Sequence, residues 1–130
     1  MASISDYMTS APHTIGKTQT LEVAHKLMAE HGIHHLPVLH SGGLVGMVTL
    51  RDLDLVESFD ALTRADLNVE EAMTAEVYVV PADAPLSDVV GAMVERGISS
   101  AIVADPNNHV LGVFTNTDAL RALRDHLASS

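Results

Sequence analysis

The sequence predicts a mixed α/β fold built from two similar copies of a β-α-β-β-α unit. The chain has 130 residues, which is the size of one compact module. Hydrophobic residues make up 47% of it, enough to build a core and too many for a disordered chain. The sequence also repeats internally, and each copy alternates between the apolar spacing of strands and that of helices.

The repeat is visible when the second half of the chain is laid over the first. Met8-Thr9 recurs as Met73-Thr74, and Gly32-Ile33 recurs as Gly97-Ile98. After one inserted residue in a turn, three further positions of the first copy recur in the second: Gly46 as Gly112, Thr49 as Thr115 and Asp52 as Asp118. We therefore predict one repeat over residues 1–56, a polar linker over 57–68 and a second repeat over 69–128.

The elements of the first copy follow in order from apolar spacing and turn residues. We expect a strand at His13–Gly16, a helix from about Leu21 to His31, strands at Ile33–Leu39 and Leu44–Thr49, and a short helix through Asp52–Val56. Gly32 suits the C-terminal cap of the first helix, because glycine adopts the left-handed conformation readily. Pro37 predicts an edge or irregular position for its strand, because proline lacks a backbone donor.

The second copy repeats this order. Asp83-Ala84-Pro85-Leu86 is typical of a helix start, and Gly97 would end that helix. Asp105-Pro106-Asn107-Asn108 predicts the hairpin turn, and a last helix is expected from about Asp118 to Leu127.

Charge and composition exclude several classes of function. Seven Lys and Arg against 17 Asp and Glu give a net charge of −10, which disfavours nucleic acid and anionic membranes as partners. The absence of cysteine excludes disulfides, thiolate nucleophiles and cysteine-based metal sites. The first residues contain neither a cationic nor an apolar signal-peptide region, and the apolar runs are too short for a bilayer. We expect a cytoplasmic location.

Three motifs, each present twice and in the same order, resemble those of a tandem pair of CBS (cystathionine β-synthase-type) domains, the Bateman module. The motifs are Ile4…Met8-Thr9 with Val69…Met73-Thr74, Gly32–Val38 with Gly97–Val103, and Gly46–Asp52 with Gly112–Asp118. The resemblance spans roughly residues 4–125 and implies two pseudo-symmetric repeats packed as one stand-alone module. It also implies clefts between the repeats that bind AMP, ADP, ATP, NAD or S-adenosylmethionine, in a regulatory sensor rather than an enzyme.

The Thr-x-x-Asp motifs suit a nucleotide on chemical grounds. Asp52 and Asp118 can accept hydrogen bonds from both hydroxyls of a ribose. Thr49 and Thr115, with free amides at a helix N-terminus, can hold a phosphate. The alternative is that these side chains only cap the following helix, and the two roles can coexist.

The resemblance assigns the remaining candidates. Arg51 and Thr117 occupy positions that commonly face the phosphate, and Arg51 is the only cation inside either motif. The pairs His34-His35 and Ser99-Ser100 would lie beside the nucleotide, where a histidine could donate to phosphate or confer pH sensitivity. His13 and Tyr78 would flank adenine. The alternatives are a solvated surface arginine, surface-strand histidines and packing of Tyr78 under the linker.

Other functions compete with a nucleotide sensor. S-adenosylmethionine would fit the low cation count, and a ligand-free interaction module that dimerises through apolar helices is a further alternative. We expect no metal site among His31, His34, His35 and His40, because no ordered ligand set accompanies them. The sequence shows no nucleophile–base pair of the kind that would indicate an enzyme. We expect a homodimer that acts on a regulated protein whose identity is unknown.

Overall fold

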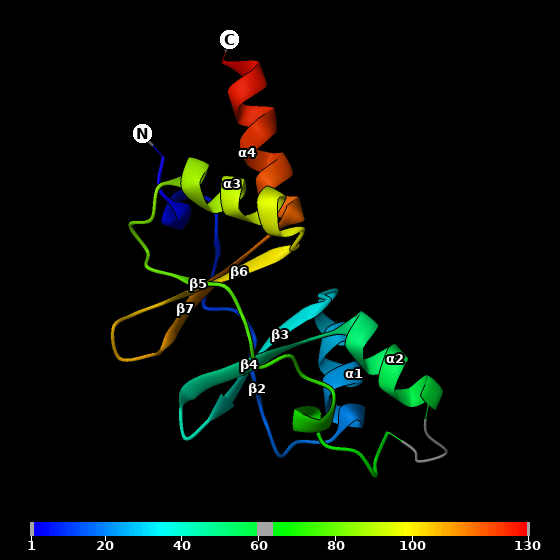
Figure 1. Cartoon of the computed structure of the whole chain (residues 1–130). Coiled ribbons are helices and arrows are strands. Elements are labelled where there is room, and N and C mark those ends of the chain that lie inside the picture. The colour runs from blue at the N-terminus through cyan, green and yellow to red at the C-terminus, as the bar shows by residue number, and fades with distance from the viewer. Residues whose placement is uncertain (1, 60–63, 130) are drawn as a thin grey trace. The chain divides into compact units, whose positions relative to one another are not determined.

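The structure, a computed structural model, describes residues 2–59 and 64–129 (Figure 1). The chain forms two compact units. The first-repeat unit is His13–Val77, and the second-repeat unit combines Tyr78–Ser130 with Met1–Pro12. Each unit therefore contains one β-α-β-β-α repeat together with the segment that opens the other repeat.

The first-repeat unit is a three-stranded sheet with two helices. Its elements are β2 (Ile15–Gly16), α1 (Leu21–His31), β3 (His35–His40), β4 (Gly43–Thr49), α2 (Leu50–Phe59) and the 3-10 helix η2 (Val69–Glu71). The strand order is β2-β3-β4, with β2 parallel and β4 antiparallel to β3.

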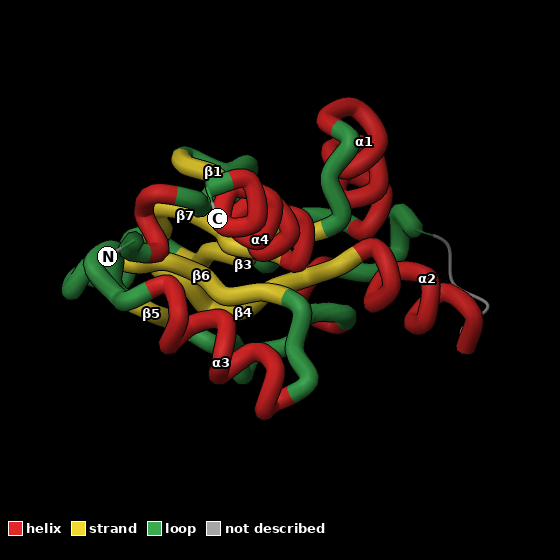
Figure 2. The backbone as a smooth tube through the Cα atoms, turned by 90° about the horizontal axis from the view of Figure 1, so that it is seen from above, coloured by secondary structure: helices red, strands yellow, loops and turns green. Residues whose placement is uncertain are grey.

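The second-repeat unit has the same order of elements and one additional strand. Its elements are η1 (Ile4–Asp6), β1 (Thr9–Ser10), β5 (Val79–Val80), α3 (Leu86–Arg96), β6 (Ser100–Ala104), β7 (Val110–Thr115) and α4 (Asn116–Ala128). Its strand order is β1-β7-β6-β5, and β6 lies between β7 and β5 in Figure 2. Figure 1 shows α3 and α4 on one side of this sheet, with the end of α4 extending beyond it.

The predicted β-α-β-β-α order is confirmed in both repeats. Helix α1 begins where the Thr20 hydroxyl accepts the Val23 N–H, and it ends at Gly32 in the left-handed conformation (φ 61°). Helix α3 ends in the same way at Gly97 (φ 63°). Helices α2 and α4 begin earlier than predicted, because a threonine rather than the aspartate is the N-cap residue.

Of the two alternatives predicted for Pro37, the edge strand is wrong, because β3 is the middle strand of its sheet, whereas β3 is indeed irregular, with a register shift between Val38 and Leu39. Pro37 is paired with Met47, whose N–H and C=O are both bonded to Thr74 instead. On the other side, β2 pairs only with Val38 and Leu39 and does not extend to Pro37. A central strand tolerates this proline because no neighbour requires its missing donor.

Each unit is completed by a short segment that carries the Met-Thr motif of the other repeat. Ile4 is fully buried among the core residues of the second-repeat unit, and Val69 is fully buried in the core of the first-repeat unit. Met8 then packs against Gly112, and Met73 packs against Gly46. The two segments have equivalent positions, so the exchange is reciprocal.

None of the helices in the described part of the chain has the length and apolarity needed to cross a bilayer.

Candidate ligand-binding turns

The first Thr-x-x-Asp motif forms the turn between β4 and α2. The Thr49 N–H donates to Asp52 Oδ2 (2.9 Å), and the Asp52 N–H donates to Thr49 Oγ1 (3.1 Å). This reciprocal pair is a capping box, with Thr49 as the N-cap residue and Asp52 in the first turn. In the protein without ligand, these two side chains therefore cap the helix, as the alternative interpretation of the motif predicts. This arrangement leaves Asp52 Oδ1 without a hydrogen-bond donor among the described residues.

The second motif forms the matching turn between β7 and α4, but its aspartate is more fully engaged. The Thr115 N–H donates to Asp118 Oδ2 (2.9 Å), as in the first turn. In addition, Arg121 Nη1 donates to Asp118 Oδ1 (2.9 Å). Asp118 is only 2% exposed, so this ion pair neutralises a buried carboxylate.

The two turns therefore differ in how much of the carboxylate remains available. The residue that matches Arg121 in the first repeat is Leu55, which is 54% exposed and offers no donor. Asp52 is half-buried and keeps one oxygen available to an incoming hydroxyl. A ligand at Asp118 would have to displace or share the guanidinium of Arg121.

Strand pairing brings the predicted histidines to the first turn. His35 is paired with Thr49 across β3 and β4, and the His34 carbonyl accepts the Leu50 N–H (3.0 Å). His34 is exposed and His35 is half-buried. His34, His35, Thr49, Arg51 and Asp52 therefore gather at one end of the first-repeat sheet.

The pKa of His35 is held below its ordinary value. Burial is the main cause, because a buried imidazole resists taking up a proton. The neighbouring His34 lowers the pKa further, whereas Asp52 raises it. His35 is therefore a neutral donor or acceptor beside the turn at pH 7.

The second turn gathers hydroxyl groups instead of imidazoles. Ser100 is paired with Thr115 across β6 and β7, and Ser99 immediately precedes it. Ser99 and Thr117 are exposed, while Ser100 and Thr115 are half-buried. The residues predicted for the second copy therefore also gather at one turn. The cation at this turn, Arg121, is already paired with Asp118.

Arg51 is the one lysine or arginine without a recorded partner among the described residues. It is exposed, in the first turn of α2. The other cations are engaged by Glu70 (Lys17), Glu30 (Lys26), Glu57 (Arg64), Tyr78 (Arg96), Asp118 (Arg121) and Asp125 (Arg124). Arg51, the residue predicted to contact a phosphate, is therefore also an available positive charge directly adjacent to Asp52 in the sequence.

His13 lies before β2 and Tyr78 lies before β5, and each contacts the end of a helix. The His13 ring stacks on His31, with centroids 3.7 Å apart and an interplanar angle of 15°. The Arg96 guanidinium lies over the Tyr78 ring, 4.7 Å from its centroid. His31 and Arg96 are matching positions of the two repeats, so the same contact occurs twice with different chemistry. Neither His31 nor Arg96 was predicted as a partner, although the two occupy matching positions of the repeat.

One face of Tyr78 is therefore covered by Arg96, and stacking on adenine would have to use the other face. No recorded contact of the described residues joins His13 or Tyr78 to the Thr-x-x-Asp turns.

Comparison with known proteins gives consistent matches along the chain. The CBS domain family model matches residues 4–56 and 69–125. CBS domain-containing protein YhcV of Bacillus subtilis (strain 168) is 32% identical over 133 residues, which cover 100% of this chain and 92% of YhcV. An uncharacterized protein of Methanocaldococcus jannaschii is 31% identical over 121 residues, but the chain spans only 43% of its length.

Two crystal structures have the same fold. AcuB from Vibrio cholerae is 28% identical, with a TM-score of 0.87 over 98% of this chain and 94% of AcuB. The CBS domain pair of protein MJ0100, in complex with 5′-methylthioadenosine and S-adenosyl-L-methionine, is 26% identical, with a TM-score of 0.84 over 97% of this chain and 98% of that one.

Proposed function

The chain belongs to the CBS domain family and contains two of its repeats, and from this we propose that it is a regulatory module that binds an adenosine-containing ligand. The ligand would bind at the Thr-x-x-Asp turns, and its presence would be passed to a partner protein. A sensor of this kind needs no catalytic group, and we propose no enzymatic activity. We also propose that the protein is located in the cytoplasm, as expected from its sequence.

The observation that carries this proposal is the available oxygen of Asp52. The capping box holds the carboxylate in place through Oδ2 and leaves Oδ1 open to the hydroxyls of a ribose. A carboxylate that is already oriented loses little side-chain entropy when it binds. The CBS pair of MJ0100, which has the same fold, contains two ligands that both carry adenosine.

Arg51 favours a phosphorylated ligand, AMP, ADP, ATP or NAD, at the first-repeat turn. An arginine that has no partner in the protein gives up no ion pair when it binds a phosphate. Near a surface, one such charge pair is worth up to about 4 kcal/mol before desolvation. A micromolar ligand has a total binding free energy of about 8 kcal/mol, so Arg51 would matter to its affinity.

The second candidate ligand is S-adenosylmethionine, which the complex of MJ0100 supports. Its sulfonium cation needs no positive side chain, and the second-repeat turn offers hydroxyls rather than a free cation. This alternative would give the two turns different ligands.

The proposal is tested by calorimetric titration of the wild type with AMP, ADP, ATP, NAD and S-adenosylmethionine. We expect at least one of them to bind and to raise the unfolding temperature by mass action. The Asp52→Asn variant should lose the binding, because an amide cannot accept charge-assisted bonds from a ribose in the same way. Failure of all five ligands to bind would favour the ligand-free interaction module.

Arg51→Thr is the matched test of the phosphate contact, because the second repeat has Thr117 at this position. We expect the affinity for ATP to fall about tenfold, the equivalent of about 1.4 kcal/mol, while the affinity for S-adenosylmethionine is unchanged. Equal losses for both ligands would contradict a contact to phosphate. The Lys26→Thr variant, which removes an exposed cation elsewhere, controls for net charge.

A further inference from the structure

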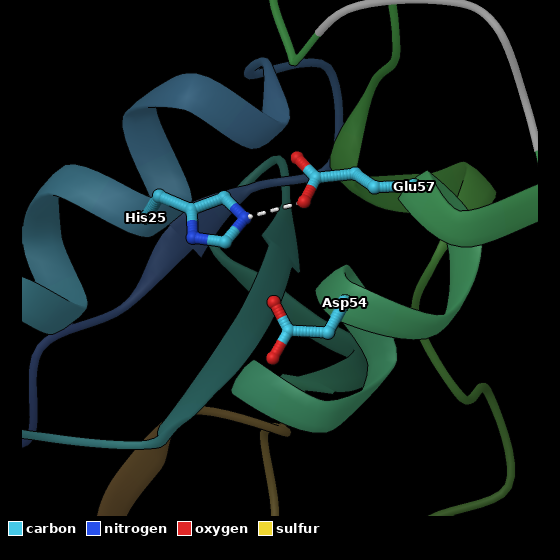
Figure 3. Close-up of side chains that lie close together, drawn as sticks. All are labelled: His25, Asp54 and Glu57. Carbon is cyan, nitrogen blue, oxygen red and sulfur yellow. Dashed lines mark hydrogen bonds and ion pairs between the residues drawn. The ribbon is translucent and has the colours of Figure 1, made fainter.

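A second cluster of polar side chains lies between the two helices of the first-repeat unit. His25 of α1 and Asp54 and Glu57 of α2 have ligand atoms that all lie within 4.8 Å of one another. Figure 3 shows the His25 ring with both carboxylates turned toward it. No residue of this cluster belongs to the Thr-x-x-Asp motif.

The helices present these groups in an order that suits a single ion. Asp54 and Glu57 are three residues apart, so they share one face of α2. His25 faces them from α1, and its Nε2 lies 3.1 Å from Glu57 Oε2. The His25 and Glu57 side chains are only 12% and 19% exposed, while Asp54 is exposed and leaves a path to solvent.

The second repeat is an internal control for what the fold requires. The positions that match His25, Asp54 and Glu57 are Val90, Leu120 and Leu123, all of them apolar. The second repeat forms the same order of elements without any histidine or carboxylate at these sites, where Leu120 and Leu123 are 65% and 50% exposed. The order of elements therefore does not depend on these polar side chains, which weakens a purely structural reason for the cluster.

One oxygen of the cluster lacks a hydrogen bond. Glu57 Oε1 is buried and accepts no hydrogen bond within the described residues. Arg64 Nε lies 3.0 Å from it, as an ion pair without the geometry of a hydrogen bond. Arg64 is 55% exposed, so its side chain can turn away into solvent when another cation takes its place.

We propose that His25, Asp54 and Glu57 bind one divalent transition-metal ion per chain, of the Zn²⁺ type, with water in the remaining positions. The imidazole favours Zn²⁺ and its neighbours over Mg²⁺ and Ca²⁺, which prefer oxygen ligands alone. The two carboxylates balance the charge of the ion. Ligand atoms at about 2.0–2.2 Å from Zn²⁺ stand roughly 3.5 Å apart in a tetrahedron, so small side-chain rotations would close the site.

The test is a titration of the whole chain with ZnCl₂, monitored by calorimetry and by competition with a chromophoric chelator. The wild type should bind one Zn²⁺ per chain at this site and bind Mg²⁺ far more weakly. Two variants should each weaken Zn²⁺ binding at least tenfold: His25→Val, which introduces the residue of the second repeat, and Asp54→Asn. The matched control is His40→Gln, which removes an exposed histidine outside the cluster and should leave the binding unchanged.

Absence of Zn²⁺ binding by the wild type would overturn the proposal, as would equal binding by the wild type and His25→Val. Circular dichroism of the metal-free variants establishes that they are folded. A second measurement on the wild type does not depend on them: Zn²⁺ should shift the NMR resonances of the His25 ring at one equivalent. Shifts confined to other histidines would also overturn the proposal.

Discussion

Asp118 and Arg121 form the ion pair that distinguishes the second Thr-x-x-Asp turn from the first. The carboxylate is buried, while the Arg121 side chain is 48% exposed, so the arginine brings charge to a group that water does not reach. Such a pair adds modest stability as a whole, but the loss of one partner leaves the other uncompensated. The arginine therefore compensates the charge of the Asp118 carboxylate, whose other oxygen caps the helix.

The variant Arg121→Leu places the residue of the first repeat in the second turn, because the matching position is Leu55. We expect it to lower the free energy of unfolding by about 1–3 kcal/mol, since a buried acceptor loses its charged donor. Urea denaturation measures this change. Leu55→Ala is the control on the first repeat, and a similar loss there would mean that the ion pair adds little.

His35 makes the stability of the protein depend on pH. Its pKa is lowered in the folded protein by burial, whereas the unfolded chain keeps a value of about 6.5. The unfolded chain therefore binds the proton first as the pH falls. The stabilising contribution is complete above about pH 6.5 and is lost as the pH falls through the lower pKa of the folded state.

Thermal unfolding between pH 5 and 7.5 tests this dependence. The unfolding temperature of the wild type should fall with pH, and that of His35→Gln should fall less steeply. His40→Gln removes an exposed histidine and should keep the wild-type slope. If His35→Gln keeps it as well, burial of His35 is not the source of the pH dependence.

Two glycines allow the Met-Thr segments to lie directly on the sheets. A Cβ at Gly46 would stand 2.8 Å from both Met73 Sδ and the Thr74 carbonyl oxygen. A Cβ at Gly112 would press on Met8 and stand 2.9 Å from the Thr9 carbonyl oxygen. The backbone oxygens cannot move aside cheaply, because the Met47 and Thr74 backbones are bonded to each other.

We expect Gly46→Ala and Gly112→Ala each to lower the free energy of unfolding by about 1–3 kcal/mol through overpacking. Gly91→Ala is the matched control, because nothing lies within 4 Å of a Cβ there and the residue is in helix α3. That substitution should raise the stability by up to about 1 kcal/mol through helix propensity. Chemical denaturation compares the three variants, and unchanged stability of Gly46→Ala would exclude the close packing.

Local patterns in the sequence predicted the order and type of the elements well, and longer-range choices less well. Apolar spacing with Gly32 and Gly97 was sufficient for α1 and α3, because helix caps and core-facing stripes are local features. The position of Pro37 in a central strand could not be predicted, because it depends on where β2 ends and on the bonds between Met47 and Thr74. The contacts of His31, Arg96 and Arg121 were missed because they join side chains whose directions periodicity does not specify.

The helices of the second-repeat unit leave an apolar surface on α4. Leu120, Leu123 and Leu127 are 65%, 50% and 62% exposed, and they recur at helical spacing. A soluble monomer gains nothing from such a stripe, whereas a second copy of the chain could cover it. This surface supports the homodimer predicted from the sequence.

Light scattering at micromolar concentration tests the prediction. The wild type should give twice the mass of the 13.8 kDa chain, and Leu123→Glu should shift the equilibrium toward the monomer. Val94→Glu, at a 75% exposed residue of α3, is a control for the added charge. A monomeric wild type would contradict the homodimer.

The reciprocal exchange of opening segments has a consequence for the order in which the chain folds during synthesis. The first-repeat unit is continuous in sequence, so all of its parts are available once Val77 has been made. The first twelve residues wait far longer, because Ile4 bonds to Ala84 and Thr9 pairs with Val113. Contacts of such long sequence separation form slowly. The segment that carries Ile4 and Thr9 therefore cannot complete its pairing until β7 has been made.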